Sequence, residues 1–559
     1  MRYLQMLGIV LLCGFGCSSL LFAQAHSPTG STVSVLTRQN DNQHTGQNLQ
    51  ETTLSTTNVN SGSFGKVFSY PVDGQIWAQP LYVPNVNILN QGTHNVAYVA
   101  TENAKVFAFD ADNAKLNPNP LWRTDFLSPP SVVAMPCSIG AGLCQLFPLV
   151  GITQTPVINP VTNTLYVVVR TMETAGTVVS YVIRLHALDI TSGAEQSGSP
   201  VVICSGVGNA SCTFGTPYKF VPKDKQGRPG LLLVNEPGFS QGVLFLGFAG
   251  GPGWVLAYDA ATLKLVATFN MSDGKERSGH GFGGVWGAGG GVVADTSGNV
   301  YVVTADGYFD GSINWGDSLL KLVLTLNKTT GTYSLVAADY FTPSDYACRF
   351  TNGLDLGSSG PLILPSQGGA TPNLIVQAGK AETTCDPTAS IYIVNRDNMG
   401  HVGGQVSLSQ APHKGVENSP AYWAGSTTQY VYSVGVNDSI RAYTVSSAGV
   451  STADVMHTSY TFLNGSTPAV SSNGTSNGIL WALDRTESGD ILPGVLPVIL
   501  HAYDANNLSN ELYNSTQAAS GRDTAGPSVK FQVPTIVNGK VYVGTQTELD
   551  VYGLCPCPQ

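Results

Sequence analysis

An acid-rich stretch at residues 306–317 offers oxygen atoms that a hard cation would bind. It contains Asp306, Asp310, Asn314 and Asp317, and Ca²⁺ in proteins takes carboxylate and amide oxygens as ligands. Their spacing does not match the D-x-[DN]-x-[DN]-G pattern of a calcium-binding loop. Carboxylates spaced in this way more often accept hydrogen bonds from the backbone of a turn. The sequence therefore favours turn capping and leaves a calcium site as the alternative.

Lys380 is a second residue whose position suggests chemistry. It ends the apolar run NLIVQAGK (373–380) in a chain of which only 11% of the residues are charged. A cation at the end of a buried strand either lines a central site or lies solvated in the following loop. Both interpretations stay open on this evidence alone.

These residues belong to a strand-and-turn unit that the chain repeats. The segment VLAYDAATLK (255–264) has counterparts beginning at residues 106, 185, 391, 440 and 500, each an alternating apolar run that closes on a polar turn. A Tyr-Val type of strand comes before such segments, and a third piece, often starting with Pro, comes before that strand. Eight such units, with outer strands such as 120–126 and 265–270, predict a single all-β, eight-bladed β-propeller of four-stranded antiparallel blades.

The two ends of the repeat region predict how the ring closes. The last unit, 533–554, supplies three strands, and an orphan strand, GKVFSYPVD (65–73), comes before the first complete unit. Pairing the two completes the eighth blade and leaves no long open sheet edge. We therefore expect a propeller at residues 61–554, a wrapped or partly mobile arm at 26–60, and a short tail at 555–559.

The first 25 residues have the pattern of an export signal. Met1 and Arg2 come before an interrupted apolar run that ends at the small-residue cleavage site Ala23-Gln24-Ala25. The run is short for a membrane span, and no later stretch predicts an integral membrane segment. We expect a secreted or periplasmic protein; a lipid anchor at Cys17 is the second option.

The cysteines and the net charge fit an exported protein. Eight cysteines remain beyond the signal, an even number that predicts disulfides in an oxidising compartment. The expected pairs are Cys137 with Cys144, Cys204 with Cys212 and, at longer range, Cys348 with Cys385, while Cys555 and Cys557 are left open. The formal net charge of −10 argues against nucleic acid as a partner.

The repeats resemble those of the quinoprotein alcohol dehydrogenase-like propellers, whose eight blades hold pyrroloquinoline quinone (PQQ) and Ca²⁺; the resemblance covers about residues 65–554. It is closest at VWGAGGGVVADTSGNVYVVTADGYFDGSINWGDSLLKL (285–322). There it implies Trp286 as the floor under the quinone and Asp306 as the metal ligand. It further implies Asp355 as the catalytic base, with Asp345 as the alternative. Lys380 takes the place of the family's cation on the quinone oxygens, so the resemblance gives it both a catalytic and a cofactor-binding role.

Three departures from that family weaken the enzyme interpretation. The adjacent cysteine pair that covers the quinone is missing, and the segment FAGGPGWVLAYD (248–259) lacks the glutamate that the family supplies to Ca²⁺. The chain also has no CxxCH motif, so we expect no covalent haem.

Several residues have a structural alternative. Trp286 either floors a cofactor or packs between blades, and Gln75, Trp77 and Gln79 either line the axial funnel or make inter-blade hydrogen bonds. We favour a scaffold that binds a protein, peptide or glycan ligand. A divergent PQQ- and Ca²⁺-dependent alcohol or sugar dehydrogenase is the alternative, and a carbohydrate-binding propeller is a weaker one.

Overall fold

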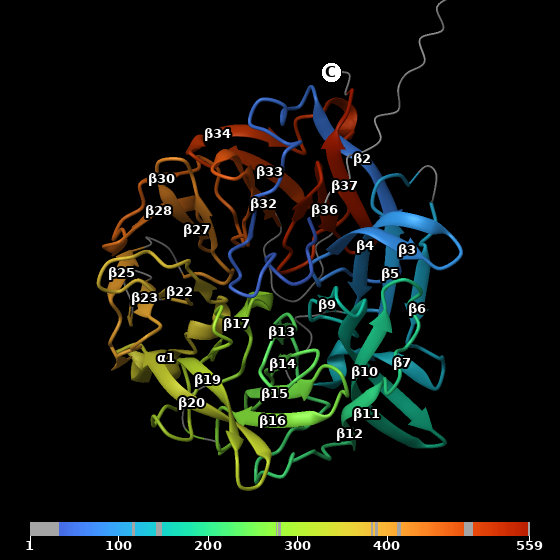
Figure 1. Cartoon of the computed structure of the whole chain (residues 1–559), viewed down its shortest axis with the longest axis vertical. Helices are drawn as coiled ribbons and strands as arrows, with labels where there is room; N and C mark the ends of the chain where they lie inside the picture. Colours follow the sequence, from blue (N-terminus) through green and yellow to red (C-terminus); the bar gives the residue numbers. More distant parts are fainter. Residues whose placement is uncertain are drawn as a thin grey trace, which may run out of the picture.

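The computed structural model describes residues 33–114, 118–140, 148–275, 277, 281–381, 384–385, 390–410, 415–485 and 496–556. Their strands form eight sheets arranged radially around one axis, which confirms the eight-bladed propeller (Figure 1). We number the blades in chain order and call the strand nearest the axis the inner strand. The segments expected to be outer strands, 120–126 and 265–270, contain β6 and β16.

Each blade is a run of antiparallel strands that follow one another from the axis outward. Blade 1 consists of β3 (Leu81–Ile88), β4 (Gly92–Thr101), β5 (Lys105–Asp110) and β6 (Trp122–Asp125), and blade 2 of β9 (Val157–Asn159), β10 (Thr164–Ala175), β11 (Val178–Asp189) and β12 (Val201–Val207). Blade 3 consists of β13 (Leu232–Val234), β14 (Val243–Phe248), β15 (Trp254–Asp259) and β16 (Leu265–Asn270). Blade 4 consists of β17 (Val292–Ala294), β18 (Val300–Val303), β19 (Leu319–Asn327) and β20 (Thr332–Thr342).

Blades 5 to 8 follow the same plan. Blade 5 consists of β21 (Leu362–Ile363), β22 (Leu374–Gln377), β23 (Ser390–Asn395) and β25 (Ser407–Gln410), and blade 6 of β26 (Ala421–Ala424), β27 (Gln429–Val434) and β28 (Ile440–Ser446) with β29 (Gly449–Val450) and β30 (Met456–His457). Blade 7 consists of β31 (Ala469–Asn473), β32 (Ser476–Asp484), β33 (Ile499–Asp504) and β34 (Asn507–Asn514). Blade 8 consists of β35 (Thr535–Val537), β36 (Lys540–Gly544), β37 (Glu548–Leu554) and β2 (Phe64–Pro71).

A few short elements are added to the blades. The strands β7 (Val132–Pro136) and β8 (Leu149–Val150) extend blade 2, β24 (His401–Val402) pairs with blade 4, and β1 (Gln47–Asn48) pairs with blade 7. The described residues contain one α-helix, α1 (Tyr346–Asn352), and short 3-10 turns that include η3 (Gly287–Gly289) and η4 (Leu356–Ser358).

The core lies between neighbouring blades rather than inside any one of them. In β14 (VLFLGF) every side chain is buried, because the sheets of blades 2 and 4 cover both of its faces. A strand covered on both sides has a continuous apolar run instead of an alternating one. Between blades 2 and 3, Tyr166 and Leu185 pack with Leu246 and Trp254. Each such side chain stabilises the fold by roughly 1.5–3 kcal/mol.

The ring closes as the sequence predicts. Strand β2 pairs antiparallel with β37, with Phe64 opposite Leu554 and Tyr70 opposite Leu549. Phe64 is fully buried, and its ring centroid lies 5.0 Å from that of Tyr513 in blade 7. The N-terminal strand therefore completes blade 8 and also packs against the blade before it.

The arm lies along the inner strands of the blades, where Figure 1 shows the dark-blue segment near the centre of the ring. It begins with Val35, whose N–H donates to the Tyr82 carbonyl in blade 1 (2.8 Å), and reaches blade 8 where Asn48 donates to the Ile536 carbonyl (3.0 Å). The six blades between are contacted in chain order, through Leu36–Ile158, Thr37–Leu231, Asn42–Ala294, Gln43–Ile363, Thr45–Tyr422 and Gly46–Val470. These bonds satisfy backbone groups that the inner strands would otherwise present as open edges.

Two of the expected disulfides are confirmed. Cys204 is bonded to Cys212 and Cys348 to Cys385. The expected partner of Cys137, Cys144, lies outside the described residues, as does Cys557. Two disulfides indicate folding in an oxidising compartment.

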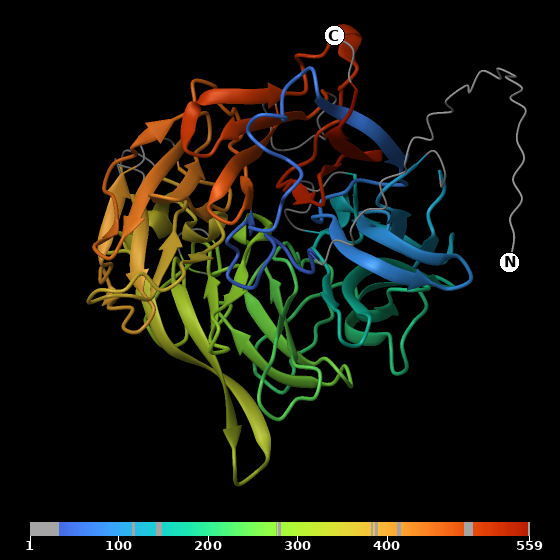
Figure 2. The same cartoon turned by 45° about the horizontal axis from the view of Figure 1, so that its top comes forward.

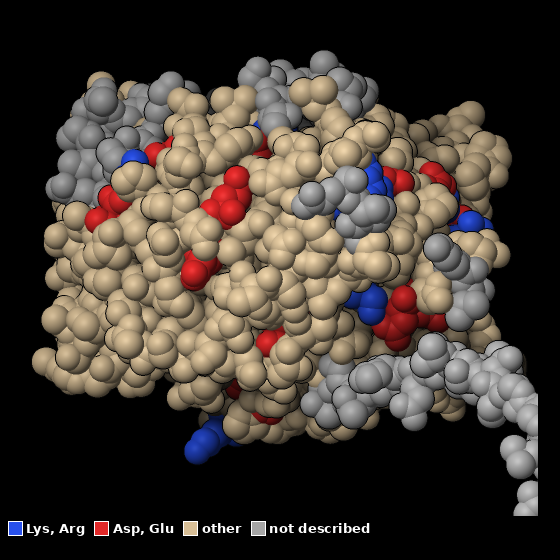
Figure 3. Space-filling model, turned by 90° about the horizontal axis from the view of Figure 1, so that it is seen from above, with Lys and Arg blue, Asp and Glu red and all other residues tan. Residues whose placement is uncertain are grey.

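The outer surface is poor in charge. Figure 3 shows isolated acidic and basic groups on a face made mostly of uncharged side chains. The hairpin of β19 and β20 projects beyond the ring (Figure 2) and exposes Leu326 and Val336. Within the described residues, no helix is both long enough and apolar enough to span a membrane.

Candidate functional site

The loops that lead into the inner strands meet at one end of the axis. In four blades a side chain stands four residues ahead of the inner strand: Trp77 before Leu81, Arg228 before Leu232, Glu417 before Ala421 and Phe531 before Thr535. In blade 5 the second strand ends at the same level, since the Lys380 N–H donates to the carbonyl of Asp355 in the loop that leads into the inner strand (3.0 Å). The repeat therefore places equivalent side chains from different blades in one ring around the axis.

Asp306, Asp355 and Lys380 come together at the junction of blades 4 and 5. The Nζ atom of Lys380 lies 2.6 Å from Oδ2 of Asp355, and the Asp306 N–H donates to Oδ1 of Asp355 (3.1 Å). Asp355 stands directly ahead of η4, and the Leu356 N–H donates to Oδ1 of Asp317 (2.8 Å). The alternative position, Asp345, instead accepts a hydrogen bond from Nε of Arg349 (3.1 Å).

The pKa values of the two carboxyl groups in this cluster, Asp306 and Asp355, are shifted in opposite directions. Burial, together with the charge and hydrogen bond of Asp355, raises the pKa of Asp306 to about 9. Burial also opposes ionisation of Asp355, but Lys380 and the bonds from Asp306 outweigh it and hold the pKa of Asp355 below its usual value. The neighbouring carboxylate raises the pKa of Lys380 despite burial. At neutral pH the cluster therefore has a protonated Asp306, an ionised Asp355 and a charged Lys380.

Trp286 lies in a stack that crosses the axis. The guanidinium of Arg228 is 4.7 Å from the centroid of the Trp286 ring and 5.1 Å from that of Phe531. The Trp77 ring meets Phe531 edge-on, with the centroids 6.1 Å apart, and Nε1 of Trp77 donates to Gln75 (2.7 Å). A cation over two aromatic faces is a favourable arrangement, and it occupies one face of each ring.

Gln79 takes the inter-blade role that the sequence left open. Its Oε1 accepts from the Gln39 N–H of the arm (2.8 Å), and its Nε2 donates to Thr535 of blade 8 (3.2 Å). Gln79 thus ties blades 1 and 8 to the arm. Trp77, by contrast, lies in the axial stack.

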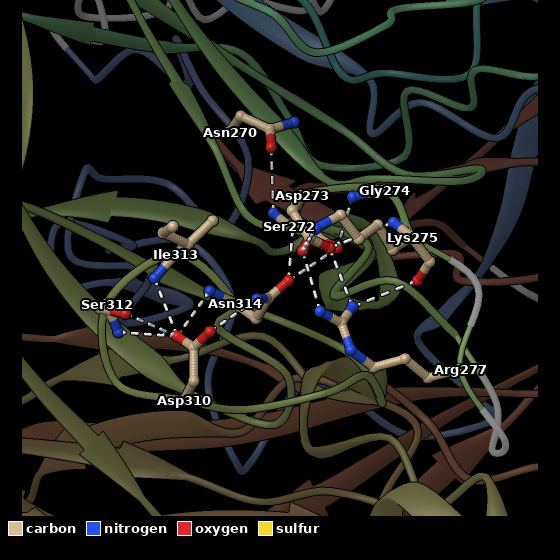
Figure 4. Close-up of polar contacts among 10 residues, drawn as sticks. All are labelled: Asn270, Ser272, Asp273, Gly274, Lys275, Arg277, Asp310, Ser312, Ile313 and Asn314. Atoms are coloured by element: carbon tan, nitrogen blue, oxygen red, sulfur yellow. Dashed lines mark hydrogen bonds and ion pairs between the residues drawn. The ribbon is translucent and has the colours of Figure 1, made fainter.

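Asp310 caps a turn. Figure 4 shows its Oδ1 accepting from the N–H groups of Ser312, Ile313 and Asn314, while Oδ2 accepts from the Asn314 amide. Asn314 in turn accepts from the Asp273 N–H (3.0 Å), so the loop joins blade 4 to the loop after β16. For this residue the turn-capping interpretation is confirmed.

The described side chains do not fit a quinone and Ca²⁺ at the positions that the resemblance implies. The space between Trp286 and Phe531, where a planar ring would stack, contains the Arg228 guanidinium. Among the described residues no group of three or more His, Cys, Asp or Glu side chains could hold a metal ion.

A pocket opens beside the stack. It has a volume of about 420 Å³ and lies among the loops and strand ends of blades 6, 7 and 8. Its lining includes Glu417, Asn437, Asn464, Arg485, Lys530 and Phe531. Phe531 belongs to both the pocket and the stack, and the charge of Glu417 acts on Lys380. The pocket therefore shares one wall with the stack, and its acidic residue contributes to the electrostatics of the aspartate–lysine cluster.

Sequence reasoning missed Arg228, Glu417 and Phe531. Each lies in a loop without a motif, and the signal that would have found them is their constant distance from the inner strand. Comparing the eight units at that one position shows an aromatic or charged residue in four of them.

One solved structure has a similar fold over most of this chain. The structure of a quinohemoprotein alcohol dehydrogenase from Comamonas testosteroni matches with a TM-score of 0.54 at 13% identity, over 94% of this chain and 81% of that one. The likeness is one of fold. Sqt1 of Saccharomyces cerevisiae gives a TM-score of 0.44 at 9% identity, over 88% of this chain and 100% of that one. The Dos1 propeller gives a TM-score of 0.38 at 10% identity, over 77% of this chain and 95% of that one. No protein-family model and no curated protein sequence matches the chain.

Proposed function

We propose that this protein is an exported binding propeller whose axial pocket holds a small hydroxyl-rich ligand of about the size of a sugar unit. The observation that carries the proposal is the pocket of about 420 Å³ among the loops and strand ends of blades 6, 7 and 8. This volume lies in the range of small-molecule sites, which is roughly 300–1,000 Å³. The pocket is formed by loops held on eight packed blades, which is a rigid setting for recognition.

The lining supports a polar ligand rather than an apolar one. Asn437 is exposed at the rim, and Glu417 and Lys530 are partly exposed. Amide and charged groups can each donate or accept hydrogen bonds to hydroxyl groups. Phe531 adds one apolar surface against which the carbon face of a sugar ring can pack.

Export is supported by the leader-like first 25 residues and by the two disulfides. A protein with this composition, poor in charge and rich in glycine, would work outside the cytoplasm as a secreted or periplasmic component. Measuring where the full-length chain accumulates in a producing cell tests this part of the proposal.

The binding claim is tested by calorimetric titration with neutral monosaccharides and disaccharides, polyols and uronic acids. We expect saturable binding of at least one class, weakened tenfold or more by Asn437→Ala or Glu417→Gln. Asn510→Ala is the matched control, because Asn510 is exposed on the outer strand β34. Binding that these two pocket variants leave unchanged would place the ligand elsewhere, and no binding in any class would refute the proposal.

The second candidate function is a divergent PQQ- and Ca²⁺-dependent alcohol or sugar dehydrogenase. One observation favours it, the contact between Asp355 and Lys380, since a base beside a cation suits removal of a proton from an alcohol. The occupied face of Trp286 opposes it. In this candidate Asp355 would accept the hydroxyl proton and Lys380 would stabilise the resulting charge.

A further inference from the structure

The arm places one charged side chain at the centre of the ring. Arg38 is 2% exposed, and its Nη2 atom donates to the carbonyl of Ala288 (3.0 Å) and to that of Phe531 (3.2 Å). Ala288 lies in the loop of blade 4 and Phe531 in the loop of blade 8, which are opposite each other in a ring of eight. A single guanidinium therefore connects the two sides of the axis.

Both acceptor residues have an unusual backbone. Ala288 has φ 47° and Phe531 has φ 57°, in the left-handed region that residues with a side chain rarely adopt. Such a conformation costs roughly 1–2 kcal/mol per residue and persists only where the surroundings hold it. The two carbonyls that Arg38 binds belong to these two residues, so its hydrogen bonds offset that cost.

The surrounding backbone leaves room for this side chain. A Cβ atom added to Gly289 would lie 2.6 Å from Cζ of Arg38, and one added to Gly230 would lie 3.0 Å from its Cβ. The loops of blades 3 and 4 thus form a glycine cradle around Arg38. Gly289 and Gly230 are themselves joined, by a hydrogen bond of 2.9 Å.

Trp286 and Phe531, the two rings that enclose Arg228, belong to the loops that Arg38 binds. We propose that Arg38 is a positioning residue through which the seated N-terminal arm sets the spacing of the axial stack and, through Phe531, one wall of the axial pocket. The proposal concerns how the site is assembled and holds whether or not the pocket binds a sugar.

The test uses the full chain labelled with 5-fluorotryptophan and read by fluorine NMR. The seven tryptophans give separate probes, and Trp77→Phe and Trp286→Phe assign the two resonances of the stack. We expect Arg38→Met to shift both of these resonances and to leave those of the remote tryptophans in place. Arg38→Lys, which keeps the charge but reaches one carbonyl, should shift them less and in the same direction.

Arg396→Met is the matched control. Arg396 also makes a largely buried contact, with Asp295 (3.0 Å), but Asp295 follows β17 and lies at the opposite end of that strand from the axial loops. We expect this variant to lower the unfolding midpoint without moving the Trp77 and Trp286 resonances. If Arg38→Met lowers the midpoint and leaves these two resonances unmoved, Arg38 is only structural and the proposal is overturned. If Arg38→Met does not fold, unmoved resonances in Arg38→Lys overturn it equally.

Discussion

Nζ of Lys380 lies 2.6 Å from Oδ2 of Asp355, although the two residues are 25 positions apart in the chain. The distance follows from the blade itself. Asp355 leads into the inner strand β21 and Lys380 follows the paired strand β22, so antiparallel pairing returns the chain to the same end of the blade.

The ion pair predicts a measurable coupling. Lys380→Met leaves the mostly buried Asp355 carboxylate without its cation, and we expect it to cost about 1–2 kcal/mol of unfolding free energy, since the lysine is partly exposed. Asp355→Asn alone should cost a similar amount. The double variant should cost less than the sum of the two, as measured by denaturant unfolding at pH 7. Strict additivity would show that the contact does not contribute to stability.

The raised pKa of Asp306 predicts a pH dependence. The folded state keeps a proton up to about pH 9 that the unfolded chain loses near 3.8, so this contribution is present at low pH and is lost as the pH rises between those values. Asp306→Asn keeps a hydrogen-bond donor toward Asp355 without the titration. We expect the stability difference between wild type and Asp306→Asn to fall with increasing pH by at most about 1.4 kcal/mol per pH unit.

Urea unfolding of both proteins at several pH values from 4 to 9 measures that difference. Asp310→Asn is the control, because the pKa of the turn-capping Asp310 lies below its usual value and is not raised. A difference that stays constant over the range would contradict the raised pKa of Asp306.

His44 predicts that the arm is sensitive to acid. Burial, and then the charge of Arg38, lowers the pKa of His44 from 6.5 to about 3. Its contribution to stability is therefore present above pH 6.5 and is lost as the pH falls toward 3, since the unfolded state takes up the proton first. We compare the unfolding temperatures of His44→Gln and wild type at each pH. As the pH falls from 6.5 to 4, the variant should lose less stability than wild type, so the difference between them should shift in favour of the variant from its value at pH 7.5. Thermal unfolding at those pH values checks this, and parallel curves would contradict it.

The disulfides predict an order of importance. Cys348–Cys385 closes a separation of 37 residues and Cys204–Cys212 one of 8, so the chain-entropy model gives losses of about 4 and about 2–3 kcal/mol when each pair is replaced by serine. Cys348–Cys385 also anchors α1 to the segment that follows Lys380. We expect the Cys348→Ser/Cys385→Ser variant to unfold at the lower denaturant concentration. If the Cys204→Ser/Cys212→Ser variant instead unfolds at the lower denaturant concentration, native contacts rather than loop length determine how much stability each disulfide contributes.

The fold was predictable because the same unit recurs eight times, so that single weak segments support one another. Ring closure followed from counting strands, and the closing strand at 65–73 overlaps β2. The meeting of Asp306, Asp355 and Lys380 followed from a resemblance that covers two consecutive blades. Arg38 and Arg228 were not predictable in this way, because their partners come from other blades and from an arm that carries no repeat. Contacts across the axis depend on how the ring closes, and no local pattern contains that information.

The account rests on Arg228 filling the space between Trp286 and Phe531. The most direct test is a titration of the purified protein with PQQ in the presence of Ca²⁺, followed by tryptophan fluorescence. We predict no saturable, Ca²⁺-dependent quenching in the micromolar range, because the ring faces that a quinone would need are already covered. Saturable quenching that requires Ca²⁺ and is lost in Trp286→Ala would contradict the account and show that the protein binds the quinone at Trp286.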